Sequence, residues 1–164
     1  MARKKHKAKP DAPPLHNDER TVALNRRARY DYEIFDTYDA GLVLTGSEIK
    51  SIRGGNVSLR EGYVQVFGGE AFLYGVHIAL YKPASHFNHD PDRPKKLLLH
   101  KPEILRLGQH LNAHGNTAVP LRLYLANGYA KVQIGVGRGR TRYDKRERIA
   151  EREVRRQIER RLRR

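Results

Sequence analysis

The architecture of this chain follows from Ala118-Val-Pro-Leu-Arg-Leu-Tyr-Leu-Ala-Asn-Gly-Tyr-Ala-Lys-Val-Gln-Ile-Gly-Val136. Residues 129–136 alternate between two faces, with Ala130, Val132 and Ile134 on the apolar one. Such alternation is typical of a strand with one buried face. Residues 118–125 are also apolar enough for a strand, and the Asn-Gly pair between the two segments is the strongest short hairpin signal in the chain. The stretch therefore predicts two antiparallel strands joined by a tight turn.

Four further strands are expected upstream of this hairpin. Residues 62–69 and 70–78 are rich in aromatic and β-branched side chains and meet at paired glycines, so they predict a second hairpin. Asp31–Tyr38 and Gly41–Gly46 are shorter candidates, and the prolines of Tyr81–Lys96 predict a loop. About six short strands separated by turns predict a mainly β domain, a small closed or partly open antiparallel barrel of the OB type.

Two short helices should interrupt the strands. Thr45-Gly-Ser-Glu48 has the spacing of a capping box, so a helix should follow and end at Gly54-Gly55. A second helix should have Pro102 in its first turn and end by Gly115, because apolar residues recur at i, i+3 and i+7 from Ile104.

The positive charge of the chain lies mainly on its ends. Of a formal net charge of +15, residues 1–14 carry +4, residues 15–137 carry +3 and residues 138–164 carry +8. Basic arms on a nearly neutral core suit a phosphate backbone, because each neutralised phosphate releases a condensed counterion. A membrane surface fits less well, since the last 27 residues contain neither Trp nor Phe and have no broad apolar face. The charge distribution therefore predicts RNA as the partner.

Three regions follow from these patterns: a basic, disordered arm over residues 1–24, an RNA-binding barrel over 25–137, and a basic tail over 138–164. The first residues have no apolar run behind their charges, so no secretory signal is expected, and the absence of cysteine fits a reducing compartment. We expect a cytoplasmic monomer in which the start of the arm is disordered.

The tail is expected to be a conditional helix. Its apolar residues recur every fourth position from Ala150 to Leu162, and Glu151–Arg155 is one of three acid-before-base pairs at i, i+4. Each such pair contributes only about 0.2–0.5 kcal/mol. Like charges such as Arg152 and Arg156 have the same spacing. The free tail should therefore fray and become ordered on a partner.

Enzymatic and metal chemistry have weak signals. Glu48 and Lys50 have the spacing of a carboxylate and a lysine in Mg²⁺-dependent nucleases, but the Thr45 cap places them in the first turn of a helix, where Glu48 serves as the cap. His86 and His89 lie in the loop without a third ligand, which favours exposed polar surface over a metal site. No metal and no cofactor are assigned.

Two clusters interleave cationic side chains with aromatic ones, which is a composition that tracks a phosphate backbone and stacks bases. The first cluster contains Asn25, Arg26, Arg27, Arg29, Tyr30 and Tyr32, and the second contains Arg138, Arg140, Arg142, Tyr143, Lys145 and Arg146. Both predict RNA contacts.

Several motifs together resemble one known family. They are Asn25-Arg-Arg-Ala-Arg followed by Asp31-Tyr32, Ala40-Gly-Leu-Val-Leu with Gly46-x-Glu48-x-Lys50-Ser51, Lys96-Leu-Leu-Leu-His-Lys101, Val119-Pro-Leu, Tyr129-Ala-Lys-Val and Asp144-Lys-Arg-Glu147. Their order and spacing are similar to those of the SsrA-binding protein (small protein B) family, from about Asn25 to Ile158. The resemblance implies an OB-like, non-enzymatic adaptor that binds the tRNA-like domain of tmRNA and delivers it to stalled ribosomes, the rescue called trans-translation.

The resemblance also implies two sets of binding residues. The tmRNA-binding set is Asn25, Arg26, Arg27, Arg29, Tyr30, Glu48, Lys50, Ser51, Arg53 and Lys131, some of which support the surface rather than lie on it. The set that enters the empty decoding centre and mRNA channel is Arg138, Arg140, Arg142, Tyr143, Asp144, Lys145 and Arg146. Tyr30 and Tyr143 stand where many members have His, which keeps stacking but removes imidazole protonation. A permanent ribosomal or assembly protein and a Mg²⁺-dependent ribonuclease are the alternatives.

Overall fold

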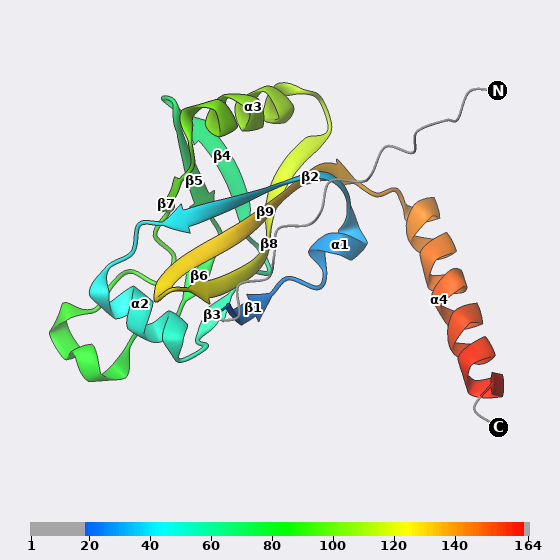
Figure 1. Cartoon of the computed structure of the whole chain (residues 1–164), viewed down its shortest axis with the longest axis horizontal. Coiled ribbons are helices and arrows are strands. Elements are labelled where there is room, and N and C mark those ends of the chain that lie inside the picture. The colour runs from blue at the N-terminus through cyan, green and yellow to red at the C-terminus, as the bar shows by residue number, and fades with distance from the viewer. Residues whose placement is uncertain (1–18, 163–164) are drawn as a thin grey trace, which may run out of the picture.

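The computed structural model describes residues 19–162, which form a curved antiparallel sheet, three helices packed around it and a long C-terminal helix (Figure 1). The main sheet has seven strands in the order β1-β8-β9-β2-β7-β5-β4, and a separate two-stranded sheet pairs β3 with β6. The strands are β1 Arg20–Leu24, β2 Tyr32–Leu42, β3 Val57–Ser58, β4 Tyr63–Phe67, β5 Glu70–Tyr74, β6 His77–Ile78, β7 Lys95–Leu98, β8 Asn116–Ala126 and β9 Tyr129–Gly139. The helices are α1 Ala28–Asp31, α2 Gly46–Arg53, the 3₁₀ helix η1 Lys82–Phe87, α3 Lys101–Asn112 and α4 Arg142–Leu162.

Both predicted hairpins are confirmed. β8 and β9 are joined by Asn127 and Gly128, whose φ angles of 51° and 79° are those that an Asn-Gly turn supplies. β4 and β5 are joined by Gly68 and Gly69, whose φ angles are also positive. The second strand, predicted over 70–78, is shorter than expected: β5 ends at Tyr74, and His77–Ile78 is β6, which pairs with β3 in the separate sheet. β8 and β9 are longer than the sequence predicted and pair along most of their length.

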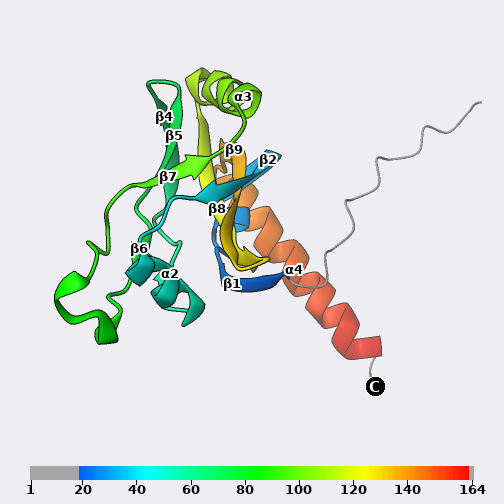
Figure 2. The same cartoon turned by 60° about the vertical axis from the view of Figure 1, so that its left-hand side comes forward.

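The closed form of the predicted barrel is wrong, although the fold is a small OB-like β fold. The sheet curls round the core without a ladder between its edge strands, β1 and β4 (Figure 2). Near this gap Gly62 lies so close to the Pro120 ring that a Cβ on Gly62 would be 2.5 Å from Pro120 Cγ. Proline has no N–H to donate, so β8 also shifts register between Pro120 and Arg122.

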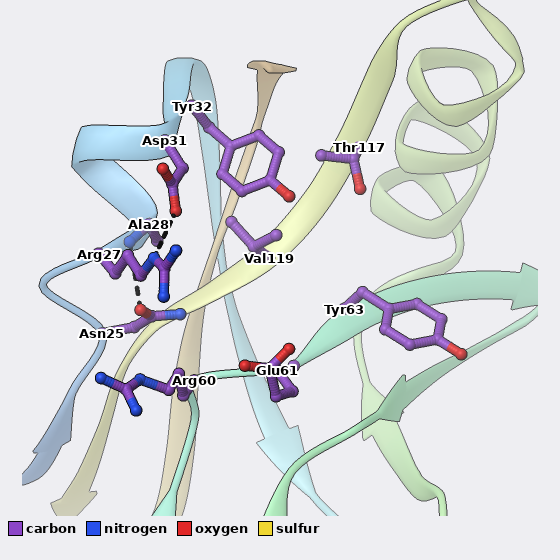
Figure 3. Close-up of a pocket in the computed structure, with 11 residues that line it drawn as sticks. Asn25, Arg27, Ala28, Asp31, Tyr32, Arg60, Glu61, Tyr63, Thr117 and Val119 are labelled. Atoms are coloured by element: carbon purple, nitrogen blue, oxygen red, sulfur yellow. Dashed lines mark hydrogen bonds and ion pairs between the residues drawn. The ribbon is translucent and has the colours of Figure 1, made fainter. Parts of the chain in front are cut away.

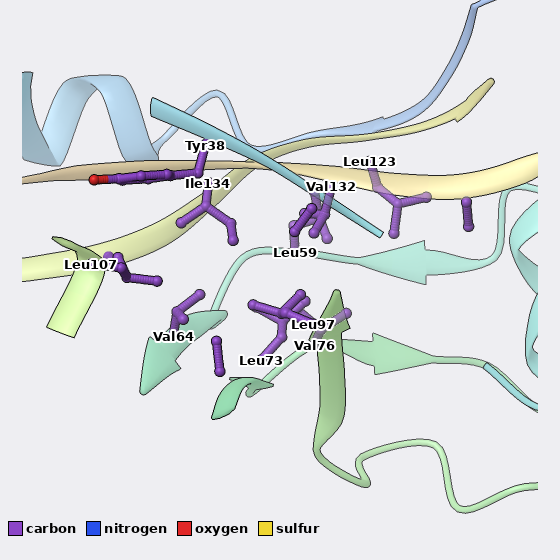
Figure 4. Close-up of a cluster of buried hydrophobic side chains, with 14 of the residues drawn as sticks. Tyr38, Leu59, Val64, Leu73, Val76, Leu97, Leu107, Leu123, Val132 and Ile134 are labelled. Carbon is purple, nitrogen blue, oxygen red and sulfur yellow. The ribbon is translucent and has the colours of Figure 1, made fainter. Parts of the chain in front are cut away.

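Aliphatic side chains from strands that face each other across the curved sheet form the main core (Figure 4). Leu123, Val132 and Ile134 of β8 and β9 face Leu73 and Leu97 of β5 and β7, and all five are almost completely buried. The alternation of β9 is thus confirmed from Tyr129 to Ile134, whereas residues 134–137 are all buried.

Several boundaries differ from the sequence predictions. The first predicted strand continues as β2 to Leu42, because Gly41 stays extended and pairs with both Leu98 and Lys131. The second strand, predicted over Gly41–Gly46, is wrong beyond Leu42, since residues 43–45 are not strand and α2 begins at Gly46. β7 lies inside and just after the predicted loop, which also contains η1. Arg20–Leu24, predicted as part of the arm, forms β1 on the edge of the sheet beside β8. Residues 1–18 lie outside the described part of the chain.

The predicted helices agree with the structure more closely than the predicted strands do. α2 begins with the expected capping box and ends at Gly54 and Gly55, and α3 has Pro102 in its first turn and buries Leu107. The tail contains one continuous helix, α4, which begins only after β9 has run on to Gly139. The exposed side chains of Val154, Ile158 and Leu162 form the apolar stripe that the sequence predicted. Folding of the tail on a partner stays a prediction.

Candidate nucleic-acid interface

Helix α2 is held by a buried ion pair between Glu48, which is 0% exposed, and Arg93. Arg93 Nε donates to Glu48 Oε1 at 2.7 Å and Arg93 Nη2 donates to Oε2 at 2.5 Å. The Thr45 N–H donates to the same Oε2 at 2.8 Å. A bidentate pair of this kind fixes the orientation of both planar groups. Arg93 therefore ties the loop before β7 to the first turn of α2, and we call this arrangement the α2 clamp.

The charge of Glu48 is neutralised within the protein. Burial raises the pKa of Glu48, but the hydrogen bonds from Arg93 and the Thr45 N–H outweigh it, so this pKa lies below the ordinary 4.5. The carboxylate is thus ionised at neutral pH and has no exposed oxygen to repel a phosphate. Glu48 positions α2 and does not present itself to a ligand.

Two buried polar side chains lie close to the α2 clamp. Lys95 is 1% exposed and donates from Nζ to the carbonyls of Val76 at 2.7 Å and Pro91 at 3.1 Å, and its burial lowers its pKa. His89 Nε2 donates to the Ile78 carbonyl at 3.0 Å, which leaves Nδ1 to accept from the Ser47 hydroxyl at 2.9 Å. The prediction that both loop histidines are exposed is therefore wrong for His89, which is buried as a structural link.

The exposed face of α2 carries the cations that the sequence analysis singled out. Lys50 and Arg53 are exposed, and Lys50 Nζ lies 5.6 Å from the centre of the Tyr81 ring. Ser51 is buried and donates to the Ala79 carbonyl at 2.6 Å, so it anchors the helix. Lys131 is exposed on β9, beside Gly41 of β2 in the ladder.

Asn25 is also a structural residue. Its side chain is buried, and Nδ2 donates to the carbonyls of Leu59 at 3.2 Å and Pro120 at 3.0 Å. Its Oδ1 accepts from the Ala28 N–H at 3.2 Å, at the start of α1. The side-chain amide of Asn25 thus links α1, β8 and the loop before β4. Asn25 was predicted as an RNA contact, but its buried side chain supports its neighbours instead.

The residues that follow Asn25 form an exposed basic surface, the α1 patch, made of Arg26, Arg27, Arg29 and Tyr30. The three arginines are exposed, and Tyr30 is half-buried. Arg27 Nε donates to Asp31 Oδ2 at 3.0 Å, which leaves part of its guanidinium available.

The first turns of α4 lie against this patch. Lys145 Nζ donates to Asp31 Oδ1 at 2.9 Å and lies 5.8 Å from the centre of the Tyr30 ring. The Arg152 guanidinium lies 5.9 Å from the same ring. The hydrogen bond from Lys145 lowers the pKa of Asp31 below its ordinary value, with a further contribution from Arg27. The predicted tmRNA-binding and ribosome-binding sets therefore meet at Tyr30 and Asp31.

The other tail residues have mixed roles. Asp144 caps α4, because it accepts from the Thr141 N–H at 3.1 Å and from the Thr141 hydroxyl at 2.7 Å, and these bonds lower its pKa. Arg138 donates to Asn116 Oδ1 at 3.1 Å, and the Arg140 N–H donates to the Asp31 carbonyl at 2.8 Å. Arg146 is exposed, and the side chains of Arg142 and Tyr143 lie outside what the structure describes.

The predicted RNA residues thus fall into two separate places. The α1 patch and α4 lie together, whereas α2 and η1 lie at the other side of the sheet in both views (Figures 1 and 2). Asp31 and Arg93 are the residues that sequence reasoning missed. The i, i+4 spacing of Arg27 and Asp31 was a usable signal, but nothing in the proline-rich loop indicated the contact of Arg93 with Glu48 across 45 residues.

The carboxylate of α2, Glu48, is buried and paired with Arg93. Within residues 19–162, no three His, Cys, Asp or Glu side chains come close enough to hold a metal ion. In the same part of the chain, no helix is long and apolar enough to cross a membrane.

Comparison with known proteins gives one family. The SmpB protein family model matches residues 22–164. The SsrA-binding protein of Roseiflexus castenholzii is 60% identical over 145 residues, which cover 88% of this chain and 92% of the relative. That of Thermobifida fusca is 52% identical over 164 residues, 100% of this chain and 99% of the relative.

A solved structure described as "tmRNA-SmpB: a journey to the center of the bacterial ribosome" contains a chain that is 44% identical to this one. The two superpose with a TM-score of 0.64 over 77% of this chain and 93% of the other. With the family model and the relatives, this likeness leads to one conclusion: the chain belongs to the SmpB protein family.

Proposed function

We propose that this protein is an RNA-binding adaptor, and not an enzyme, that binds the tRNA-like domain of tmRNA and brings it to stalled ribosomes for trans-translation in the cytoplasm. The observation that carries the proposal is the division of the chain into two unlike parts. A rigid, nearly neutral body presents two basic patches, and a strongly basic helix leaves it at the α1 patch. The relatives named SsrA-binding protein and the neighbour from a tmRNA-SmpB complex support the same function.

The body is suited to reading the shape of folded RNA. The α2 clamp fixes the position of helix α2, so the backbone that carries Lys50 and Arg53 is in place before the ligand arrives. Preordered donors lose little entropy on binding and favour a ligand whose phosphates match their spacing. A tRNA-like domain offers such fixed spacing, while a flexible single strand does not.

The tail is suited to a phosphate-lined channel. α4 carries many exposed cations and an exposed apolar stripe, and among the described side chains Lys145 meets Asp31 and Tyr30, while Arg152 lies over the same Tyr30 ring. An mRNA channel that already holds message excludes such a helix, and an empty one accepts it. Channel occupancy would then distinguish stalled ribosomes from translating ones.

The binding part of the proposal is tested by the affinities of the full chain for the tRNA-like domain of tmRNA, an ordinary tRNA and an RNA duplex. We expect the first to bind most tightly and the double variant Lys50→Ala/Arg53→Ala to lose much of that preference. Arg106→Ala, on the exposed face of α3, is the matched control for loss of a cation and should bind as the unmodified protein does. Equal affinity for all three RNAs would instead favour a general ribosomal protein, and cleavage of RNA with Mg²⁺ would favour the ribonuclease.

The salt dependence of this binding should be steep. If the patches and tail together neutralise about six phosphates, the affinity should fall by roughly three decades between 50 and 200 mM salt. A flat response in a titration over this range would mean that shape contacts dominate.

A further inference from the structure

A polar pocket of about 420 Å³ opens between α1 and the start of β4 (Figure 3). Its floor is Ala28 and Val119, two members of a small second core cluster. Polar and aromatic residues form its walls: Arg27, Asp31, Tyr32, Arg60, Glu61, Tyr63 and Thr117. The volume lies in the range of small-ligand sites, and a mainly polar lining with two aromatic rings suits a small planar group that is itself polar.

The wall that carries Glu61 is rigid. The Asn25 side chain holds this wall in place by donating to the Leu59 carbonyl, two residues before Glu61. A Cβ on Gly62 would lie 2.5 Å from the Pro120 ring, and one on Gly75 would lie 2.3 Å from the Glu61 carbonyl oxygen, so both glycines are packed against their neighbours. The loop before β4 therefore holds its side chains in a fixed place, as a preformed binding site requires.

The pocket contains charges that the protein does not pair. Asp31 is already engaged by Arg27 and Lys145. Among the described residues, in contrast, Arg60 and Glu61 make no side-chain hydrogen bond or ion pair. In Figure 3 the Glu61 carboxylate lies between Arg60 and Tyr63. Both residues are exposed, and in Figure 3 the Arg60 side chain extends away from the Glu61 carboxylate. A carboxylate without a cation on it disfavours a bare phosphate and suits a group that offers hydrogen-bond donors.

We propose that this pocket binds a guanine base of the RNA, with the Glu61 carboxylate as the group that selects it. This inference rests on the proposed RNA-binding function and adds a base-specific site to it. Guanine offers two adjacent donors, N1–H and the N2 amino group, which one carboxylate accepts together. Adenine, cytosine and uracil each place an acceptor next to their donor on that edge, so a carboxylate meets repulsion as well as a hydrogen bond.

The remaining walls complete the site for a nucleotide. The rings of Tyr32 and Tyr63 are flat surfaces for stacking, and Tyr63 is itself braced by Tyr74, whose ring centre is 5.5 Å away at an angle of 16°. Arg60 lies beside Glu61, where it can meet the phosphate of the same nucleotide. The pocket adjoins the α1 patch, since Arg27 belongs to both.

The test compares three nine-nucleotide oligouridine RNAs that carry guanosine, inosine or adenosine at the central position, bound to the full chain at one salt concentration. Inosine lacks only the N2 amino group. We expect the guanosine RNA to bind at least about fivefold more tightly than the other two, which is the lower end of what a bidentate base contact provides. Glu61→Gln should abolish this preference and keep the affinity for the inosine RNA.

Glu33→Gln is the matched control, because Glu33 is exposed on β2 outside the pocket and the charge change is the same. It should keep the guanosine preference. Equal binding of guanosine and inosine by the unmodified chain, or an unchanged preference in Glu61→Gln, overturns the pocket assignment. If the tRNA-like domain still binds in that case, only the pocket inference fails; if that domain does not bind either, the proposed function fails with it.

Discussion

The barrel body and helix α4 differ in how they use charge. In the body, Glu48 and Lys95 are ionisable residues buried deep beside α2, and each has specific partners. In α4, which has 21 residues, the described side chains are mostly exposed, and one ion pair, from Lys145 to Asp31, links its first turn to the body. Buried, paired charges thus hold the α2 surface in one arrangement before any partner binds. The exposed charges of α4 have few partners within the protein, so a binding partner can supply them.

Removal of residues 140–164 should give the largest effect. Tagging of nascent chains on stalled ribosomes should be lost, because the segment that would enter the channel is gone. The body should keep most of its affinity for the tRNA-like domain and almost all of its stability, measured by thermal unfolding, because α4 adds mainly exposed contacts. Normal tagging by the shortened chain would show that the tail is only a nonspecific electrostatic arm.

Loss of the α2 clamp should be the next largest effect. In Glu48→Ala the partly buried guanidinium of Arg93 loses its carboxylate partner. We therefore expect the free energy of unfolding to fall by about 3 kcal/mol, as when one partner of a buried pair is removed. Glu70→Ala, which removes the partner of Lys96 in an exposed pair, should cost less than about 1 kcal/mol and serves as the control. Urea unfolding measures both, and equal small losses would mean that the clamp does not stabilise α2.

The same carboxylate should make stability depend on pH. Because the pKa of Glu48 is lower in the folded chain than its ordinary 4.5, its contribution is fully present above pH 4.5 and is lost as the pH falls through the folded value. Urea unfolding from pH 7 to pH 3 should show this decline. In Glu48→Gln the decline should be shallower, and an identical slope in both proteins would contradict the assignment.

The smallest effect should come from the junction of the two regions. Asp31→Asn removes the charge that Lys145 and Arg27 meet, but all three side chains are partly exposed, so the free energy of unfolding should change by less than about 1 kcal/mol. Limited proteolysis at α4 should nevertheless become faster, because its first turns lose an anchor. Unchanged proteolysis would indicate that the tail is held by other contacts.

Local sequence signals predicted the parts of the fold that depend on neighbours in the chain. The Asn127-Gly128 turn, the paired glycines 68 and 69 and the Thr45–Glu48 cap each act within a few residues, and all were correct. β7 was missed because its strand character comes from pairing with β5 and β2, not from its own Lys-Lys-Leu-Leu sequence. β1 was missed for the same reason, since β8 supplies its only ladder.

The candidate site was predicted less evenly. Sequence identified the exposed cations of α1 and α2, because exposure and charge can be read from composition. It could not show that Asn25, Glu48 and Ser51 are buried, since their partners Pro120, Arg93 and Ala79 are distant in the chain. Burial makes Asn25 and Ser51 supports of the surface, while for Glu48, which the sequence predicted as the helix cap, the structure adds Arg93 as a partner.

The way β9 passes into α4 has a mechanical consequence. Gly137 lies against the Glu33 carbonyl so closely that a Cβ there would be 2.3 Å from it, and the Arg140 N–H is bonded to Asp31, so the last residues before α4 are clamped to the sheet. A helix of 21 residues is roughly 30 Å long at about 1.5 Å per residue. The far end of α4 is therefore roughly 30 Å from the residues that are clamped to the sheet, so a small change in the direction in which α4 starts moves that end through a much larger distance.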